Sequence, residues 1–326
     1  MITVQKQLLL KSALLGLCTV FLFPSTALSQ GENKDSAPEL NSPVTQQTAI
    51  DAKVSAQDKK DIEKFLSNFE KDWNGHNLEG VMGNYSDDYV NNDGFDKKII
   101  NQLMGELWKT YPDIKSSSFT KSIRVDGPYA TIGTHDDVTG TTASEAQGLG
   151  KGELHSISEG LLFCKRVGNQ WKIIGDRIDY EKNKVSYGLG RQLDPSFAAP
   201  EQVKSGKQFS ARLEVDMPTG LAAMGTISQA TLSYPPPKPP EVYKPMGDPL
   251  NDRPLLERVM TANAKNRNEL LMATIGLTNA SRNSLLGMVI LTRRLNVVPP
   301  MEEEPAKAET AASAETKKTP EETTIK

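Results

Sequence analysis

Cysteine is scarce in this chain, and long apolar runs are absent after its N-terminal segment. The two cysteines are Cys18 and Cys164, so loss of the N-terminus leaves no partner for an internal disulfide. No later stretch reaches the ~18 consecutive apolar residues of a membrane-spanning helix. We therefore expect no membrane span after the N-terminus, and we expect Cys164, in the apolar run Gly160–Lys165, to be a buried packing residue.

The chain has no excess of positive charge, and histidine is scarce. The formal net charge is −3, which gives little attraction for a phosphate backbone and makes nucleic acid an unexpected partner. The three histidines, His76, His135 and His155, lack the spacing of a zinc site. The glycines of 148–152 lack the third glycine of a dinucleotide turn and the Ser or Thr of a phosphate loop. No metal or cofactor is expected.

The first 29 residues have the pattern of a cleavable signal peptide. Lys6 and Lys11 precede a short apolar stretch, Ser12–Phe23. Pro24 and a small-x-small motif that ends at Ser29 follow this stretch. This pattern predicts cleavage before Gln30 and export to the periplasm or the cell exterior. A lipoprotein site at Cys18 is the alternative, and the leucine before it disfavours that site.

Two polar segments flank the remaining chain. Residues 30–54 are rich in Ser, Pro, Gln and Asn, and residues 299–326 consist almost entirely of charged and small residues. Neither composition can bury enough apolar surface to offset the entropy of ordering. We expect a disordered linker and a disordered tail.

Apolar residues then recur at helical spacing in three segments, which predicts three amphipathic helices. The second and third lie within 78–85 and 99–108. The first is carried by Ile62, Phe65, Leu66, Phe69 and Trp73.

The period changes to that of strands after residue 118. Strands are expected over 119–125, 129–138, 153–167 and 171–180, with Gly168-Asn169 as a hairpin turn. Helices followed by an antiparallel meander predict an α+β fold. Because the last strand is apolar on both faces, the sheet face away from the helices should meet a second subunit or the next domain.

Residues 188–298 read as an all-β sandwich. Strict alternation in Phe209–Val215 and Leu271–Leu277 predicts short strands separated by turns, and the prolines of 235–240 predict an exposed loop. The polar run Asn263–Glu269 is expected to staple a loop by side-chain hydrogen bonds, with a contact surface as the alternative.

Three short motifs stand out: Phe69–Asn77 (F-x-x-x-W-x-x-H-N), Tyr85-Ser-Asp-Asp-Tyr89, and the hairpin Lys165–Asp176. Together they resemble the nuclear-transport-factor-2-like superfamily, which includes polyketide-cyclase-like (SnoaL-like) and ketosteroid-isomerase-like proteins. The resemblance implies an α+β cone, with three helices on a curved antiparallel sheet that enclose a pocket, and dimerisation through the outer sheet face. Ala199–Phe209 is similar to the opening strands of bacterial immunoglobulin-like sandwiches.

The expected organisation has five parts: a signal peptide (1–29), a linker (30–54), a nuclear-transport-factor-2-like domain (55–187), an immunoglobulin-like sandwich (188–298) and a tail (299–326).

The same resemblance implies how a site would work. Catalysis in such a pocket uses a carboxylate base with a phenol or protonated carboxyl as hydrogen-bond donor. Asp176 or Glu159 is then the candidate base and Tyr85 or Tyr89 the candidate donor, with Asp93 and Asp136 as further carboxyls. The candidates for lining a ligand pocket are Trp73, Tyr85, Tyr89, His135 and Asp176.

The leading hypothesis from sequence is an exported, non-enzymatic protein that binds a small apolar ligand or a partner chain and can form a homodimer. A periplasmic isomerase, cyclase or hydrolase with a carboxylate base is the first alternative. A purely structural envelope protein is the second. An enzymatic pocket should place an inward carboxylate with a raised pKa beside a tyrosine hydroxyl, which separates it from the other two.

Overall fold

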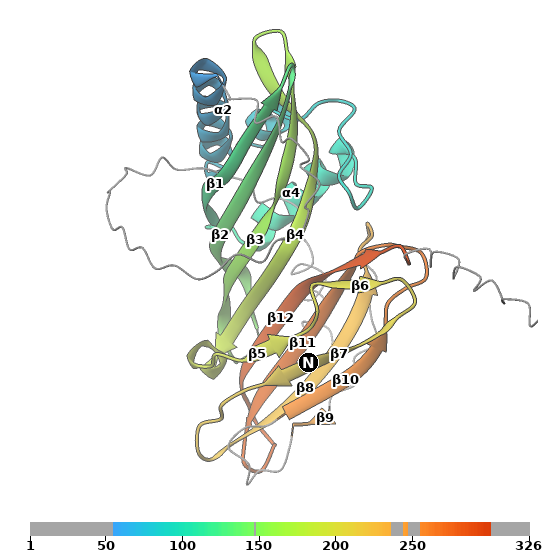
Figure 1. Ribbon diagram of the computed structural model, residues 1–326. Helices are drawn as coiled ribbons and strands as arrows, with labels where there is room; N and C mark the ends of the chain where they lie inside the picture. Colours follow the sequence, from blue (N-terminus) through green and yellow to red (C-terminus); the bar gives the residue numbers. More distant parts are fainter. Residues whose placement is uncertain (1–54, 147, 236–243, 247–254, 301–326) are drawn as a thin grey trace, which may run out of the picture.

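A computed structural model describes residues 55–146, 148–235, 244–246 and 255–300 of the protein (Figure 1). The expected signal peptide, the linker, Cys18 and nearly all of the expected tail lie outside these residues, as do the prolines of 236–240. The predictions for those segments therefore stay predictions. Within the described residues, no helix combines the length and apolarity that crossing a bilayer requires.

Among the residues that the structure describes, three helices precede the strands. They are α2 (Ala56–Asn74), α3 (Leu78–Gly83) and α4 (Lys97–Thr110). Side chains cap the longer two, because Ser55 accepts from the backbone N–H of Asp58 and Asp96 accepts from that of Ile99. Most of the buried residues of α2 and α4 are the apolar ones whose spacing predicted these helices, and Glu70 and Thr110 are buried with them.

Twelve strands follow, with a short 3-10 helix, η2 (Leu189–Gln192), in the described part of the chain. The first eight are β1 (Lys115–Asp126), β2 (Tyr129–Ala146), β3 (Gly150–Val167), β4 (Gln170–Gly188), β5 (Ser196–Ala198), β6 (Gln202–Lys204), β7 (Gln208–Glu214) and β8 (Leu221–Thr231). The last four are β9 (Lys244–Pro245), β10 (Leu255–Thr261), β11 (Glu269–Asn279) and β12 (Leu285–Val298).

Most of these strands form one large sheet. Its order is β1-β2-β3-β4-β12-β11-β8-β9, with β6 pairing with β12, and a separate sheet has the order β10-β7-β5. The strand β4 carries the connection, since its C-terminal part Lys182–Gly188 pairs antiparallel with Gly287–Arg293 of β12. Figure 1 shows β4 running from the helix-bearing half of the molecule into the other half, beside β12.

The expected fold class, a three-helix α+β cone joined to a separate all-β sandwich, is therefore wrong. Strands dominate the structure, the three helices are short, and a single antiparallel sheet runs through both halves. The physical reason is the length of β4, which extends eight residues beyond the expected end at Tyr180 and offers its edge to β12. Alternation of apolar and polar residues does not indicate which distant strand pairs with that edge.

The large sheet has apolar clusters on both of its faces. On the face next to α2 and α4, called here the inner face, Leu270 and Met272 of β11 join the same core as the helices. Their neighbours Leu271 and Ala273 point the other way and pack with β7 and β10. Residues 269–278 of β11 are consequently buried on both sides.

Two smaller expectations are confirmed. Cys164 is 1% exposed, and burial raises the pKa of its thiol to about 12, so it packs as an apolar residue. The side chain of Asn263 accepts from the backbone N–H groups of Lys265 and Arg267 and donates to the Arg267 carbonyl. It therefore staples this polar loop as predicted.

Candidate acid–base site

The loop after α3 acts as an extra strand along the N-terminal part of β4. The backbone N–H of Ser86 donates to the Ile173 carbonyl at 2.8 Å, and that of Asn92 donates to the Asp176 carbonyl at 3.1 Å. One edge of β4 is thus covered first by residues 84–92 and then by β12. This arrangement places the side chains of the loop against the inner face at Asp176.

A glycine makes this close approach possible. A Cβ atom on Gly175 would lie 2.9 Å from the carbonyl oxygen of Val90, which is closer than real Cβ contacts. We expect Gly175→Ala to lower the free energy of unfolding by about 1–3 kcal/mol, because the loop must move off β4. Urea unfolding followed by tryptophan fluorescence measures this.

Gly105→Ala in α4 is the matched control, because nothing lies within 4 Å of its added Cβ. Alanine favours a helix over glycine by about 0.5–1 kcal/mol, so the control should be stabilised. Equal effects of the two substitutions would contradict the close approach of loop and strand.

Two candidate residues from the sequence, Tyr89 and Asp176, form a hydrogen bond in this position. The Tyr89 hydroxyl donates to Oδ2 of Asp176, and the two residues are 1% and 8% exposed. Tyr85 packs against Tyr89 edge-to-face with ring centroids 4.8 Å apart. The other carboxyl oxygen of Asp176 is buried and makes no hydrogen bond with any described residue.

The environment of Asp176 favours its protonated form. Burial raises its pKa from 3.8 to about 7, and the hydrogen bond from Tyr89 opposes this shift. Repulsion by Asp93 raises the pKa further, and attraction by Arg294 lowers it. A carboxyl with a pKa near neutrality can both release and accept a proton under ordinary conditions.

A row of buried polar side chains crosses the inner face further along β4, at Glu181. Ser118, Asp136, Ser158 and Glu181 are direct cross-strand neighbours on β1 to β4, and each is at most 3% exposed. Ser118 donates to Asp136, and burial raises the pKa of Glu181. The inner face is therefore polar at its centre.

A second row lies one step along the strands. Asn183 pairs with Ser156 on one side and with Thr292 of β12 on the other. Its side-chain amide donates to Glu181 at 2.6 Å and to Thr292 at 2.9 Å. Oδ1 of Asn183 and Oγ of Ser156 are buried and make no hydrogen bond with described residues. Such atoms are costly to bury unless a polar group meets them.

Two further candidates, the possible base Glu159 and the pocket candidate His135, lie together on the opposite face. Oε1 of Glu159 is 2.9 Å from Nδ1 of His135, and Oε2 is 2.7 Å from Nζ of Lys121. The Lys121 hydrogen bond is the main cause that lowers the pKa of Glu159. The ring of His135 stacks on the exposed Phe119 at 4.7 Å. This cluster is solvent-facing and separate from Asp176.

Trp73 lies in the core under α2. It is fully buried and meets Trp108 of α4 edge-on, with ring centroids 6.1 Å apart. Of the five residues expected to line a pocket, the structure brings Tyr85, Tyr89 and Asp176 together. Trp73 is part of the adjoining core, and His135 lies on the outer face.

Sequence reasoning missed two residues of this region, Glu181 and Arg294. Both are polar residues at inward positions of otherwise apolar strands, and both are 3% exposed. The usable signal was their type, because charged residues are rarely buried without a specific partner. Among the described residues, no group of three or more His, Cys, Asp or Glu is arranged to hold a metal ion.

Comparisons with known proteins add little beyond this geometry. No family model matches the chain, and no curated protein matches it. Solved structures that resemble it include nuclear-transport-factor-2-like proteins described as dehydratases, over about 37% of the chain. At the similarities given below, the likeness assigns neither a family nor an activity.

Three of these structures illustrate the range. A proposed scytalone dehydratase from Novosphingobium aromaticivorans is 13% identical over 37% of this chain and 83% of its own, with a TM-score of 0.32. A proposed dehydratase of the NTF2-like family from Streptomyces avermitilis is 10% identical over 37% of this chain and 95% of its own, at 0.30. Bd1075 of Bdellovibrio bacteriovorus is 15% identical over 37% of this chain, at 0.32, and the match spans only 40% of its length.

Proposed function

We propose that the protein is an enzyme that catalyses a proton transfer, with Asp176 as its general acid and base. The observation that carries this proposal is the buried hydrogen bond between Tyr89 and Asp176 on the inner face. The pKa of Asp176, raised to about 7, leaves both protonation states populated near neutral pH. Tyr89 holds the carboxyl in one orientation and stabilises its ionised form.

This pair supports the enzymatic alternative over a protein that only binds an apolar ligand. A binding pocket gains nothing from an ionisable carboxyl in its wall, because burying that carboxyl costs stability at neutral pH. A proton-transfer catalyst needs such a group, since its efficiency is highest when its pKa lies near the working pH.

The polar rows support a substrate with oxygen-containing groups. Ser156 and Asn183 offer a hydroxyl and an amide oxygen that no described residue satisfies. We infer that the substrate is a carbonyl or hydroxyl compound whose acidic C–H lies against Asp176. In the reaction Asp176 takes this proton as a carboxylate. It then returns the proton either to another carbon of the same molecule or to a hydroxyl group whose C–O bond breaks, so that the hydroxyl leaves as water.

The test uses 5-nitrobenzisoxazole, a generic probe whose ring opens when a base removes its C–H proton. The wild-type protein should open it with a rate that rises through a midpoint near pH 7. Asp176→Asn should reduce this rate by at least about a hundredfold, because the base is lost. The absorbance of the phenolate product measures the rate.

Asp179→Asn is the matched control, because Asp179 is an exposed carboxylate three positions along the same strand. It should leave the rate unchanged. Equal rates in wild type and Asp176→Asn would remove the proposed function.

A further inference from the structure

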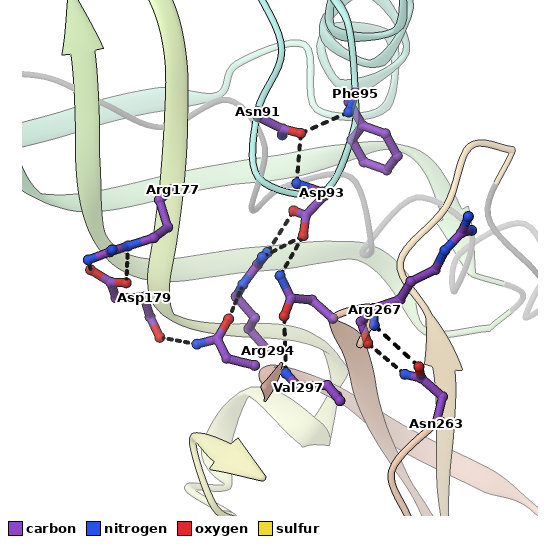
Figure 2. A network of polar contacts seen from close by, with 11 residues as sticks. Asn91, Asp93, Phe95, Arg177, Asp179, Asn263, Arg267, Arg294 and Val297 are labelled. Carbon is purple, nitrogen blue, oxygen red and sulfur yellow. Dashed lines mark hydrogen bonds and ion pairs between the residues drawn. The ribbon is translucent and has the colours of Figure 1, made fainter. Parts of the chain in front are cut away.

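The loop between α3 and α4 contains a tight turn that presents Asp93 to β12. Oδ1 of Asn91 accepts from the backbone N–H groups of Asp93 at 3.0 Å and Phe95 at 2.9 Å. Gly94 has a φ of +82°, which glycine adopts without strain. Figure 2 shows Asp93 pointing from this turn toward Arg294. The turn fixes the backbone of Asp93 independently of its charge.

Arg294 donates two parallel hydrogen bonds to the carboxylate of Asp93. Nη1 donates to Oδ2 at 3.0 Å and Nη2 donates to Oδ1 at 2.6 Å, and both side chains are 1% exposed. Further contacts fix each end, because Nε of Arg294 donates to Asn296 at 2.8 Å and Asn268 donates to Asp93 at 2.8 Å. Bidentate pairing of this kind holds a carboxylate in one orientation.

This buried ion pair adjoins the acid–base site. Asn92, the neighbour of Asp93 in the chain, donates its backbone N–H to the Asp176 carbonyl. Arg294 follows Thr292 on the inner face, and Thr292 is bonded to the Asn183 amide that also donates to Glu181. The side-chain carboxyls of Asp93, Asp176 and Glu181 are thus all buried near the guanidinium of Arg294.

We propose that Arg294 is a positioning residue of the Asp176 site: it orients the carboxylate of Asp93, whose backbone the turn already fixes near Asp176, so that β12 completes a site whose acid lies on β4. The inference rests on the proposed function and deepens it. The C-terminal strands are then part of the reaction centre instead of an appended module.

The charges facing Asp176 support opposite roles for the two members of the pair. Asp93 repels the ionised form of Asp176 and raises its pKa, whereas Arg294 attracts that form and lowers it. On β4 itself, Glu181 is the neighbouring buried carboxyl, and its pKa is raised by burial. From the loop, Tyr89 donates the hydrogen bond already described.

The experiment measures the pKa of Asp176 by NMR titration of ¹³C-labelled aspartate carboxyls, with the signal assigned from Asp176→Asn. Asp93→Asn should lower this pKa by about one pH unit or more, because it leaves Arg294 unopposed. Arg294→Gln should raise it. The double variant Asp93→Asn/Arg294→Gln should lie nearer to wild type than Asp93→Asn does.

Arg293→Gln is the matched control. Arg293 immediately precedes Arg294 on β12 and donates to the Phe197 carbonyl, whereas Arg294 donates to Asp93. It should leave the titration of Asp176 unchanged. If Arg294→Gln does not fold, Asp93→Asn and the double variant decide the question alone, because the fall in the first should be reversed in the second.

The two proposals fail in different ways. A wild-type Asp176 that titrates near 4 removes the proposed function and with it this inference. A wild-type pKa near 7 that Asp93→Asn leaves unchanged or raises overturns the role of the Asp93–Arg294 pair and leaves the proposed function standing.

Discussion

Replacing Arg294 with methionine is expected to lower the free energy of unfolding by about 3–5 kcal/mol at neutral pH. The substitution leaves the carboxylate of Asp93 buried with one remaining side-chain donor, Asn268. An uncompensated buried charge costs far more than the ion pair itself contributes. Urea unfolding at pH 7, followed by tryptophan fluorescence, measures the change.

Two controls separate this effect from the loss of an arginine as such. Asp93→Asn/Arg294→Met should cost less than Arg294→Met, because no charge is left behind. Arg212→Met breaks an exposed pair with Glu214 and should cost no more than about 1 kcal/mol. The prediction is wrong if Arg294→Met is as mild as Arg212→Met.

Asp176→Asn is expected to stabilise the protein at high pH, whereas Arg294→Met destabilises it. Below pH 3.8 the carboxyl is protonated in the folded and unfolded states alike. Between 3.8 and about 7 the folded state keeps a proton that the unfolded state has lost, so stability falls as the pH rises. Above about pH 7 the protonated form of Asp176 no longer contributes to the free energy of unfolding.

The size of this effect follows from the shift in pKa. From 3.8 to about 7, at about 1.4 kcal/mol for each pH unit, the penalty reaches roughly 4 kcal/mol. Asparagine keeps an oxygen that can accept from Tyr89 and cannot ionise. The variant should therefore match wild type near pH 4 and exceed it by up to that amount at pH 8.

The measurement is the difference in unfolding free energy between variant and wild type from pH 4 to pH 8, in which other titrating groups cancel. Asp179→Asn, an exposed site, should give a flat difference. A flat difference for Asp176→Asn as well would show that Asp176 has an ordinary affinity for protons in the folded state.

Local structure followed from the sequence where neighbouring residues determine it. The spacing of Ile62, Leu66, Phe69 and Trp73 predicted α2, and all four are buried as that spacing requires. The hairpin turn at Gly168-Asn169 was likewise predicted from neighbouring residues. The pairing of β4 with β12 was not, because alternation predicts the face of each residue but not the strand that lies beside it.

Residue type alone suggested Asp176 and Tyr89 for the candidate site, but the sequence did not show that they lie together on the inner face. Counting inward positions from Trp171 and Ile173 in steps of two places Asp176 on the outer face. The strand β4 gains an extra residue at Ile174 and another at Asp179, where its register with β3 shifts. Each bulge reverses the alternation, and so Asp176 and then Glu181 point inward. Glu159 remains outside.

The pairing of β4 with β12 also sets an order of events when the chain is made. The edge Lys182–Gly188 has no partner strand until Gly287–Arg293 has been synthesised, about a hundred residues later. An open edge of a long strand invites pairing with other chains, and contacts between such distant segments form slowly. The nascent protein therefore has to protect this edge until almost its whole length has emerged.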